Sequence, residues 1–206
     1  MTGRRGRSPA LPGLVAAALA TLTSPTTARA HLNSTGMGPL YDGVLHFVLS
    51  PEDLLPVLGL ALLAGLRGGA QSRRVLFVLP VAWLLGGLAG TAAPATGGSP
   101  FVSAAWFLLL GGLVAADARV PQGVTVGLAV VLGLSHGWLN GSGMGDLGPA
   151  VGALVGLTAS VFIVVALGSA LVVSLRAHWA RIAVRVAGSW VAASGLLLLG
   201  WAARLR

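Results

Sequence analysis

The chain has 206 residues, of which 55% are hydrophobic and only 9% are charged, so it has too little polar surface to cover a soluble globule of this size. Its net charge of +8 comes entirely from arginine, and these arginines lie in the leader, in short loops and at the C-terminus, which argues against a nucleic-acid partner. Because cysteine is absent, any metal would have to be held by nitrogen and oxygen ligands.

The start of the chain has the pattern of a secretory signal peptide. Three arginines precede an apolar stretch over residues 11–22, and the small-residue sequence A-R-A follows at 28–30. The apolar stretch is short for a membrane span, although an uncleaved first helix is the alternative. We expect residues 1–30 to be a cleaved signal peptide and 31–206 to be a single transmembrane helical domain with His31 outside the cytoplasm.

Six apolar segments follow the leader. Most are long enough, as helices rising 1.5 Å per residue, to cross a hydrocarbon core of roughly 30 Å. Helices are expected because a backbone in lipid must satisfy its own hydrogen bonds, and the alternating pattern of a barrel is missing. The sequence therefore predicts an all-α integral membrane protein with about six transmembrane helices, at residues 53–66 (with a short segment at 41–49 before it), 74–91, 101–116, 122–140, 149–175 and 182–203.

The distribution of arginine predicts how these helices are oriented. With the N-terminus outside, seven loop arginines face the cytoplasm and only Arg204 and Arg206 face outward, as the positive-inside rule favours. This orientation describes a multi-pass protein of the inner, or cytoplasmic, membrane. The inward arginines are Arg67, Arg73, Arg74, Arg119, Arg176, Arg181 and Arg185.

Histidines and carboxylates gather on the predicted outer side. Ionisable residues beside or within a membrane are costly, so they are functional candidates by default. Imidazole and carboxylate together suit divalent ions such as nickel, cobalt, zinc or copper(II). The candidate metal ligands are His31, Asp42, His46, Glu52, Asp53 and His136.

Spacing suggests how some of these residues pair. Asp42 and His46 are four residues apart and share one face of a helix, and His136 and Asn140 repeat that spacing. Each has a simpler explanation: an ion pair for the first two, and an interhelical hydrogen bond in a glycine-rich seam for His136. A terminal His31 would offer its amino group and its imidazole to one metal, or would be a tolerated polar residue.

The segment Ser50-Pro51-Glu52-Asp53 is typical of a helix start, with Ser50 as the N-cap, Pro51 in the first turn and two acids that complement the helix dipole. Glu52 and Asp53 thus have a structural explanation as well as a metal-binding one.

Other chemistries find no support in the chain. There is no G-x-S-x-G elbow, and no P-loop or Rossmann fingerprint is present. We therefore expect a protein that is not an enzyme and requires no cofactor, with a metal ion as substrate rather than as a resident group.

Several motifs together resemble the HupE/UreJ family of hydrogenase and urease accessory membrane proteins, which are regarded as nickel, and sometimes cobalt, permeases. The motifs are His31, G-P-L-Y-D-G over 38–43 with His46, S-P-E-D-L-L-P over 50–56, and H-G-W-L-N-G over 136–141. By resemblance, the family's terminal histidine corresponds to His31, its first-span Asp and His to Asp42 and His46, and its later histidine to His136.

Two departures mark the chain as a divergent member. Asp53 stands where the family's G-x-D-H-L-L stretch has histidine, and Asn140 stands where a second histidine would be familiar. Both changes make the predicted site richer in oxygen ligands.

The sequence predicts a secondary permease for a divalent transition-metal ion, with nickel first and cobalt next. The core ligands would be His46 and Asp42, with His136 as a third and His31, Glu52 and Asp53 as entry groups. The alternative is a membrane accessory or scaffold protein that does not transport and instead binds metal or a partner subunit. The sequence leaves open whether the unit is a homo-oligomer or docks another membrane chain.

Overall fold

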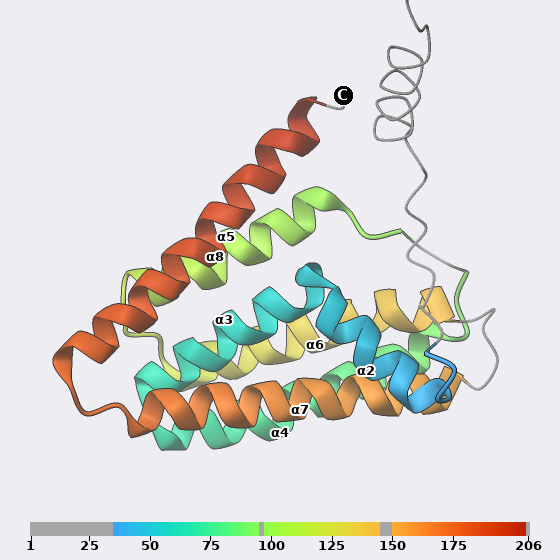
Figure 1. Cartoon of the computed structure of the whole chain (residues 1–206), viewed down its shortest axis with the longest axis horizontal. Coiled ribbons are helices and arrows are strands. Elements are labelled where there is room, and N and C mark those ends of the chain that lie inside the picture. Colours follow the sequence, from blue (N-terminus) through green and yellow to red (C-terminus); the bar gives the residue numbers. More distant parts are fainter. Residues whose placement is uncertain (1–34, 95–96, 145–149, 205–206) are drawn as a thin grey trace, which may run out of the picture. The chain divides into compact units, whose positions relative to one another are not determined.

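The computed structural model describes residues 35–94, 97–144 and 150–204, and all regular structure within these ranges is helical (Figure 1). The predicted signal peptide and His31 lie outside the described residues. The helices are α2 (Pro39–Leu49), α3 (Pro51–Arg67), α4 (Gly69–Gly90), α5 (Pro100–Ala115), α6 (Gln122–Met144), α7 (Ala150–Ser174) and α8 (His178–Arg204).

Four of these helices, α4, α6, α7 and α8, are each long and apolar enough to cross a membrane by themselves. The pair α2 and α3 passes the same test as one broken segment, and α5 is a shorter apolar helix. These elements occupy the six segments that the sequence predicts. The all-α membrane fold is therefore confirmed, and the chain is a multi-pass membrane protein.

A sharp break separates α2 from α3, whose axes differ by 74°. Ser50 between them is extended (φ −98°, ψ 95°), as expected for a residue that precedes proline, and Pro51 then opens α3. The predicted helix start is correct in position, but the Ser50 side chain makes no capping hydrogen bond. The break turns the last turn of α2 toward the first turn of α3.

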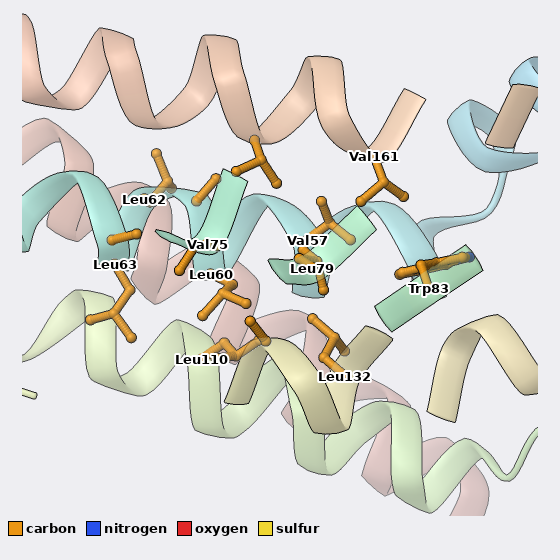
Figure 2. Packing of buried hydrophobic residues seen from close by; sticks show 14 of the residues in the cluster. Val57, Leu60, Leu62, Leu63, Val75, Leu79, Trp83, Leu110, Leu132 and Val161 are labelled. Atoms are coloured by element: carbon orange, nitrogen blue, oxygen red, sulfur yellow. The ribbon is translucent and has the colours of Figure 1, made fainter. Parts of the chain in front are cut away.

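Helix α3 is the centre of the structure and contacts each of the other described helices. Every residue from Gly59 to Leu66 is buried. Figure 2 shows Leu60 and Leu63 of this helix among Val75 and Leu79 of α4, Leu110 of α5 and Leu132 of α6. Most of α3 is therefore buried among the other described helices.

Helices α4 and α6 pack so closely that their backbones touch. A Cβ atom added at Gly137 would collide with the carbonyl oxygen of Trp83 and would lie 2.9 Å from the amide nitrogen of Gly87. Added Cβ atoms at Gly133 and Gly141 would also meet the α4 backbone. Small residues permit such close crossings in membranes, and this crossing fixes the rotation of α6 that turns His136 inward.

Candidate metal site

Three helices bring ionisable side chains together at one end of α3. His46 comes from the last turn of α2, Asp53 from the first turn of α3 and His136 from α6. The side chains of Asp53 and His136 are each only 5% exposed, and that of His46 is 16% exposed. Charged groups are rarely buried to this extent without specific partners, so the arrangement calls for a chemical explanation.

Helix α2 is held in place by close contacts with α7. A Cβ at Gly43 would collide with the carbonyl of Ala153, and one at Gly156 would collide with the carbonyl of Leu40. Because α2 is fixed on this face and then bends at Ser50, His46 lies over the start of α3 and beside α6.

Asp53 is the centre of a hydrogen-bonded cluster. His136 Nδ1 lies 2.8 Å from Asp53 Oδ1, and Asn140 Nδ2 lies 3.2 and 3.1 Å from the two carboxylate oxygens. His46 Nε2 lies 2.9 Å from Asn140 Oδ1 and 4.0 Å from Asp53 Oδ2. We call these four residues, His46, Asp53, His136 and Asn140, the Asp53 cluster.

The donors and acceptors follow from this network. An ionised Asp53 only accepts, so His136 Nδ1 and Asn140 Nδ2 both donate to it. The Asn140 oxygen is then the acceptor for the Nε2 proton of His46. With neutral rings, the nitrogens that carry lone pairs are His46 Nδ1 and His136 Nε2. A histidine that donates one nitrogen to a carboxylate and offers the other is a common arrangement around metals.

In this conformation the polar side chains of the Asp53 cluster hydrogen-bond to one another. Within the described residues, no group of three or more His, Asp or Glu side chains has its ligating atoms gathered as a metal would require. Asp53 is occupied by hydrogen bonds to His136 and Asn140, which turn their polar atoms toward one another. The residue types fit a divalent ion, and a side-chain rearrangement would be needed to receive one.

Two aromatic rings lie against His136 of the cluster. The Trp83 ring of α4 lies 5.5 Å from that of His136, and the Trp106 ring of α5 lies 6.4 Å from it. Phe47 packs edge-on against Trp83 at 6.2 Å. An open hollow of about 300 Å³ beside Trp106 is apolar and carries no ligand residue; it is lined by Phe101, Val102, Ala105, Trp106 and Leu109.

The other predicted ligands have different surroundings. Asp42 accepts hydrogen bonds from the Thr35 amide at 2.5 Å and the Thr35 hydroxyl at 2.7 Å, both through Oδ1. Glu52 is exposed, and His31 lies outside the described residues. The structure thus brings together His46, Asp53 and His136 and leaves Asp42 and Glu52 apart; the metal-binding roles of all six remain predictions.

Asn140 joins the cluster although the sequence does not place it among the ligands. Its four-residue spacing from His136 is the signal that puts both on one face of α6. That it connects His46 to Asp53 depends on the packing of α2 and α3, which spacing along one helix does not contain.

A second polar group lies at the other end of α3. Arg67 forms an ion pair with Asp117, and Arg181 Nη2 lies 3.2 Å from Asp117 Oδ2. Asp117 has a left-handed backbone (φ 49°), and Arg185 donates a 2.8 Å hydrogen bond to the Ala115 carbonyl. Three of the arginines that the sequence assigns to one side of the membrane, Arg67, Arg181 and Arg185, therefore lie around Asp117 and the end of α5.

The apolar helices, the broken α2–α3 segment and the buried histidine–carboxylate cluster define an α-helical multi-pass membrane protein with a polar site at one end. Comparison with known proteins places it within a family. The model of the HupE / UreJ protein family matches residues 19–198, and Protein HupE of Rhizobium leguminosarum bv. viciae is 30% identical over 189 residues, which cover 88% of this chain and 94% of the relative. The chain belongs to the HupE/UreJ family. No solved structure matches it.

Proposed function

We propose that this protein is a permease for a divalent transition-metal ion, nickel first and cobalt next, and that the Asp53 cluster captures the ion. The observation that supports it best is the convergence of two histidines and one aspartate from three helices in a nearly buried position. Ionisable residues at such positions in membrane proteins commonly mark ion pathways.

The ligand types favour this class of ion. Imidazole suits nickel, copper and zinc, and a carboxylate adds a hard, charged ligand. In this proposal His46 Nδ1 and His136 Nε2 bind the ion, and Asp53 either orients His136 or binds directly. The resemblance to nickel and cobalt permeases supports the choice of metal.

The break between α2 and α3 supports transport over static binding. Several transporters place their ion sites at discontinuous helices, where the backbone leaves the helical pattern beside a polar pocket. In this chain His46 and Asp53 flank such a break, with Ser50 and Pro51 between them. Rotation at this break would separate the His46 ring from Asn140 and open the cluster to an ion.

The proposed energy source is the gradient of the ion and the membrane potential. The potential contributes about 2.3 kcal/mol per elementary charge per 100 mV, and a divalent ion doubles that value. Neither an enzymatic step nor a cofactor is part of the proposal.

The test is the metal content of cells, measured by mass spectrometry for nickel, cobalt, zinc, copper and manganese. Cells express the wild type, His46→Ala or His178→Ala at matched membrane levels. His178 is the matched control because it is a histidine at the start of α8, remote in sequence from the cluster and exposed. We expect nickel to rise in cells with the wild type or His178→Ala and to stay at background with His46→Ala.

If cells with His46→Ala still accumulate nickel, the Asp53 cluster is not the site that captures the ion. If no metal rises in cells with the wild type, and the protein co-purifies with another membrane chain, the alternative of an accessory or scaffold protein gains support.

A further inference from the structure

Trp83 carries a buried hydrogen-bond donor for which the described residues supply no acceptor. Its side chain is fully buried (0% exposed), and its indole nitrogen has no hydrogen-bond partner among them. An indole N–H only donates, and leaving such a donor unsatisfied in the interior is costly. Since most buried polar groups in proteins are paired, this donor calls for an explanation.

The position of Trp83 links this donor to the Asp53 cluster. Its ring is 5.5 Å from that of His136, with the planes inclined by 41°. Its backbone carbonyl lies against Gly137, the residue after His136, so the two side chains occupy the same level of the α4–α6 crossing. Figure 2 shows the indole nitrogen at the end of the ring that points away from Val75 and Leu79.

The acceptor for this donor must be an oxygen or another electron-rich atom. A metal ion cannot accept a hydrogen bond, and the positive end of the N–H dipole beside a bare cation is unfavourable. An oxygen bound to the ion can accept it while its other lone pair faces the metal. The Trp83 N–H therefore suits an ion that still carries an oxygen ligand.

The number of protein ligands leads to the same expectation. Two imidazoles and one carboxylate supply three or four donor atoms, whereas nickel in a tetragonal site of nitrogen and oxygen takes four ligands in the plane and up to two more along the axis. Water or hydroxide is the simplest ligand for the remaining positions.

We propose that the Trp83 N–H donates a hydrogen bond to a water or hydroxide that the ion retains, so that the cluster receives the divalent ion in a partly hydrated form. This inference rests on the proposed function. It makes Trp83 a residue that positions the ion through its oxygen ligand, in addition to its packing against His136.

The test uses the purified full-length protein in detergent, titrated with nickel and, separately, with cobalt. Trp83→Phe keeps an aromatic ring and removes the N–H group. Trp106→Phe is the matched control, since it makes the same change in the other tryptophan ring that lies against His136. Replacing Trp83 by 3-benzothienylalanine removes the N–H group while preserving the bicyclic ring, which separates hydrogen bonding from packing.

We expect both replacements at Trp83 to weaken metal affinity by about tenfold, the effect of losing one hydrogen bond to a charged group, and Trp106→Phe to change it little. The visible spectrum of bound cobalt should also change with both Trp83 replacements, since it reports the number and geometry of ligands. Metal uptake by cells should fall in parallel.

Wild-type affinity and an unchanged cobalt spectrum in both Trp83 replacements would overturn the inference. So would a defect in Trp83→Phe that 3-benzothienylalanine does not share, because the ring would then be the important part. If the wild type itself binds neither metal, the proposed function fails first, and the inference fails with it.

Discussion

Two aspartates, one near each end of α3, have partners of different charge. Asp53, 5% exposed, is surrounded by two histidines and an asparagine, which carry no fixed charge. Asp117, 29% exposed, pairs with Arg67 and Arg181. Arg67, the α3 residue that pairs with Asp117, lies fourteen residues after Asp53, or about 21 Å along the helix at 1.5 Å per residue.

Under the proposed function, this difference indicates which aspartate can take part in binding an ion. The charge of Asp117 is already balanced by two permanent cations, so a metal would have to displace arginine. The partners of Asp53 carry no fixed charge, and under the proposed function His46 and His136 bind the ion through their free ring nitrogens. We therefore expect changes at Asp53 to affect ion handling and changes at Asp117 to affect stability.

The largest expected effect is that of Asp53→Asn. The amide keeps the size of the side chain and removes the charge that orients His136, so the ion should bind at least about tenfold more weakly, about 1.4 kcal/mol, and cellular nickel should fall. Mass spectrometry of cells with matched membrane levels checks this. Nickel accumulation equal to that of the wild type would show that the charge of Asp53 is not needed for ion capture.

A second change acts through the helix crossing. Gly137→Leu should force α4 away from α6, because even a Cβ atom would meet the α4 backbone, and should cost about 1–3 kcal/mol through overpacking. Gly127→Leu is the control on the same helix, since a Cβ there meets nothing within 4 Å. Thermal unfolding in detergent compares the two, and equal midpoints would contradict this packing.

Asp117→Asn should lower stability by up to about 1 kcal/mol, typical of a partly exposed ion pair, and leave nickel accumulation unchanged. Asparagine tolerates the left-handed backbone at this position, so the change isolates the charge. Thermal unfolding at low and high salt measures the effect, which should shrink as salt screens the pair. A loss of uptake without a loss of stability would assign this end a role in transport.

The smallest expected effect is a gain. Asn140→His should place a second imidazole on α6 and tighten nickel binding by up to about fivefold, about 1 kcal/mol, so that nickel accumulation rises. The same cellular measurement applies. A strong loss would show that the two hydrogen bonds of Asn140, to His46 and Asp53, matter more than an added ligand.

Features that depend on nearby residues could be predicted from the sequence. The lengths of the apolar segments predict the helices, and Pro51 predicts the break before α3, since proline restricts the residue that precedes it. The cost of ionisable groups in a membrane identifies His46 and His136 as candidates. The gathering of arginines near Asp117 follows from their shared side of the membrane.

The composition of the cluster depends on contacts between distant segments. Helical spacing favours Asp42 as the partner of His46, because the two are four residues apart. The 74° bend and the packing of α2 on α7 instead bring His46 to Asp53 and Asn140, while Asp42 bonds to Thr35. Neither the bend angle nor the packing can be obtained from the spacing of residues along one helix.

The proposed function requires that imidazoles of the Asp53 cluster bind the ion. X-ray absorption spectroscopy of nickel bound to the purified full-length protein tests it directly, because imidazole ligands give a recognisable scattering pattern. We expect imidazole in the nickel shell of the wild type and its loss in the double variant His46→Ala/His136→Ala. Identical spectra for the two proteins would contradict it.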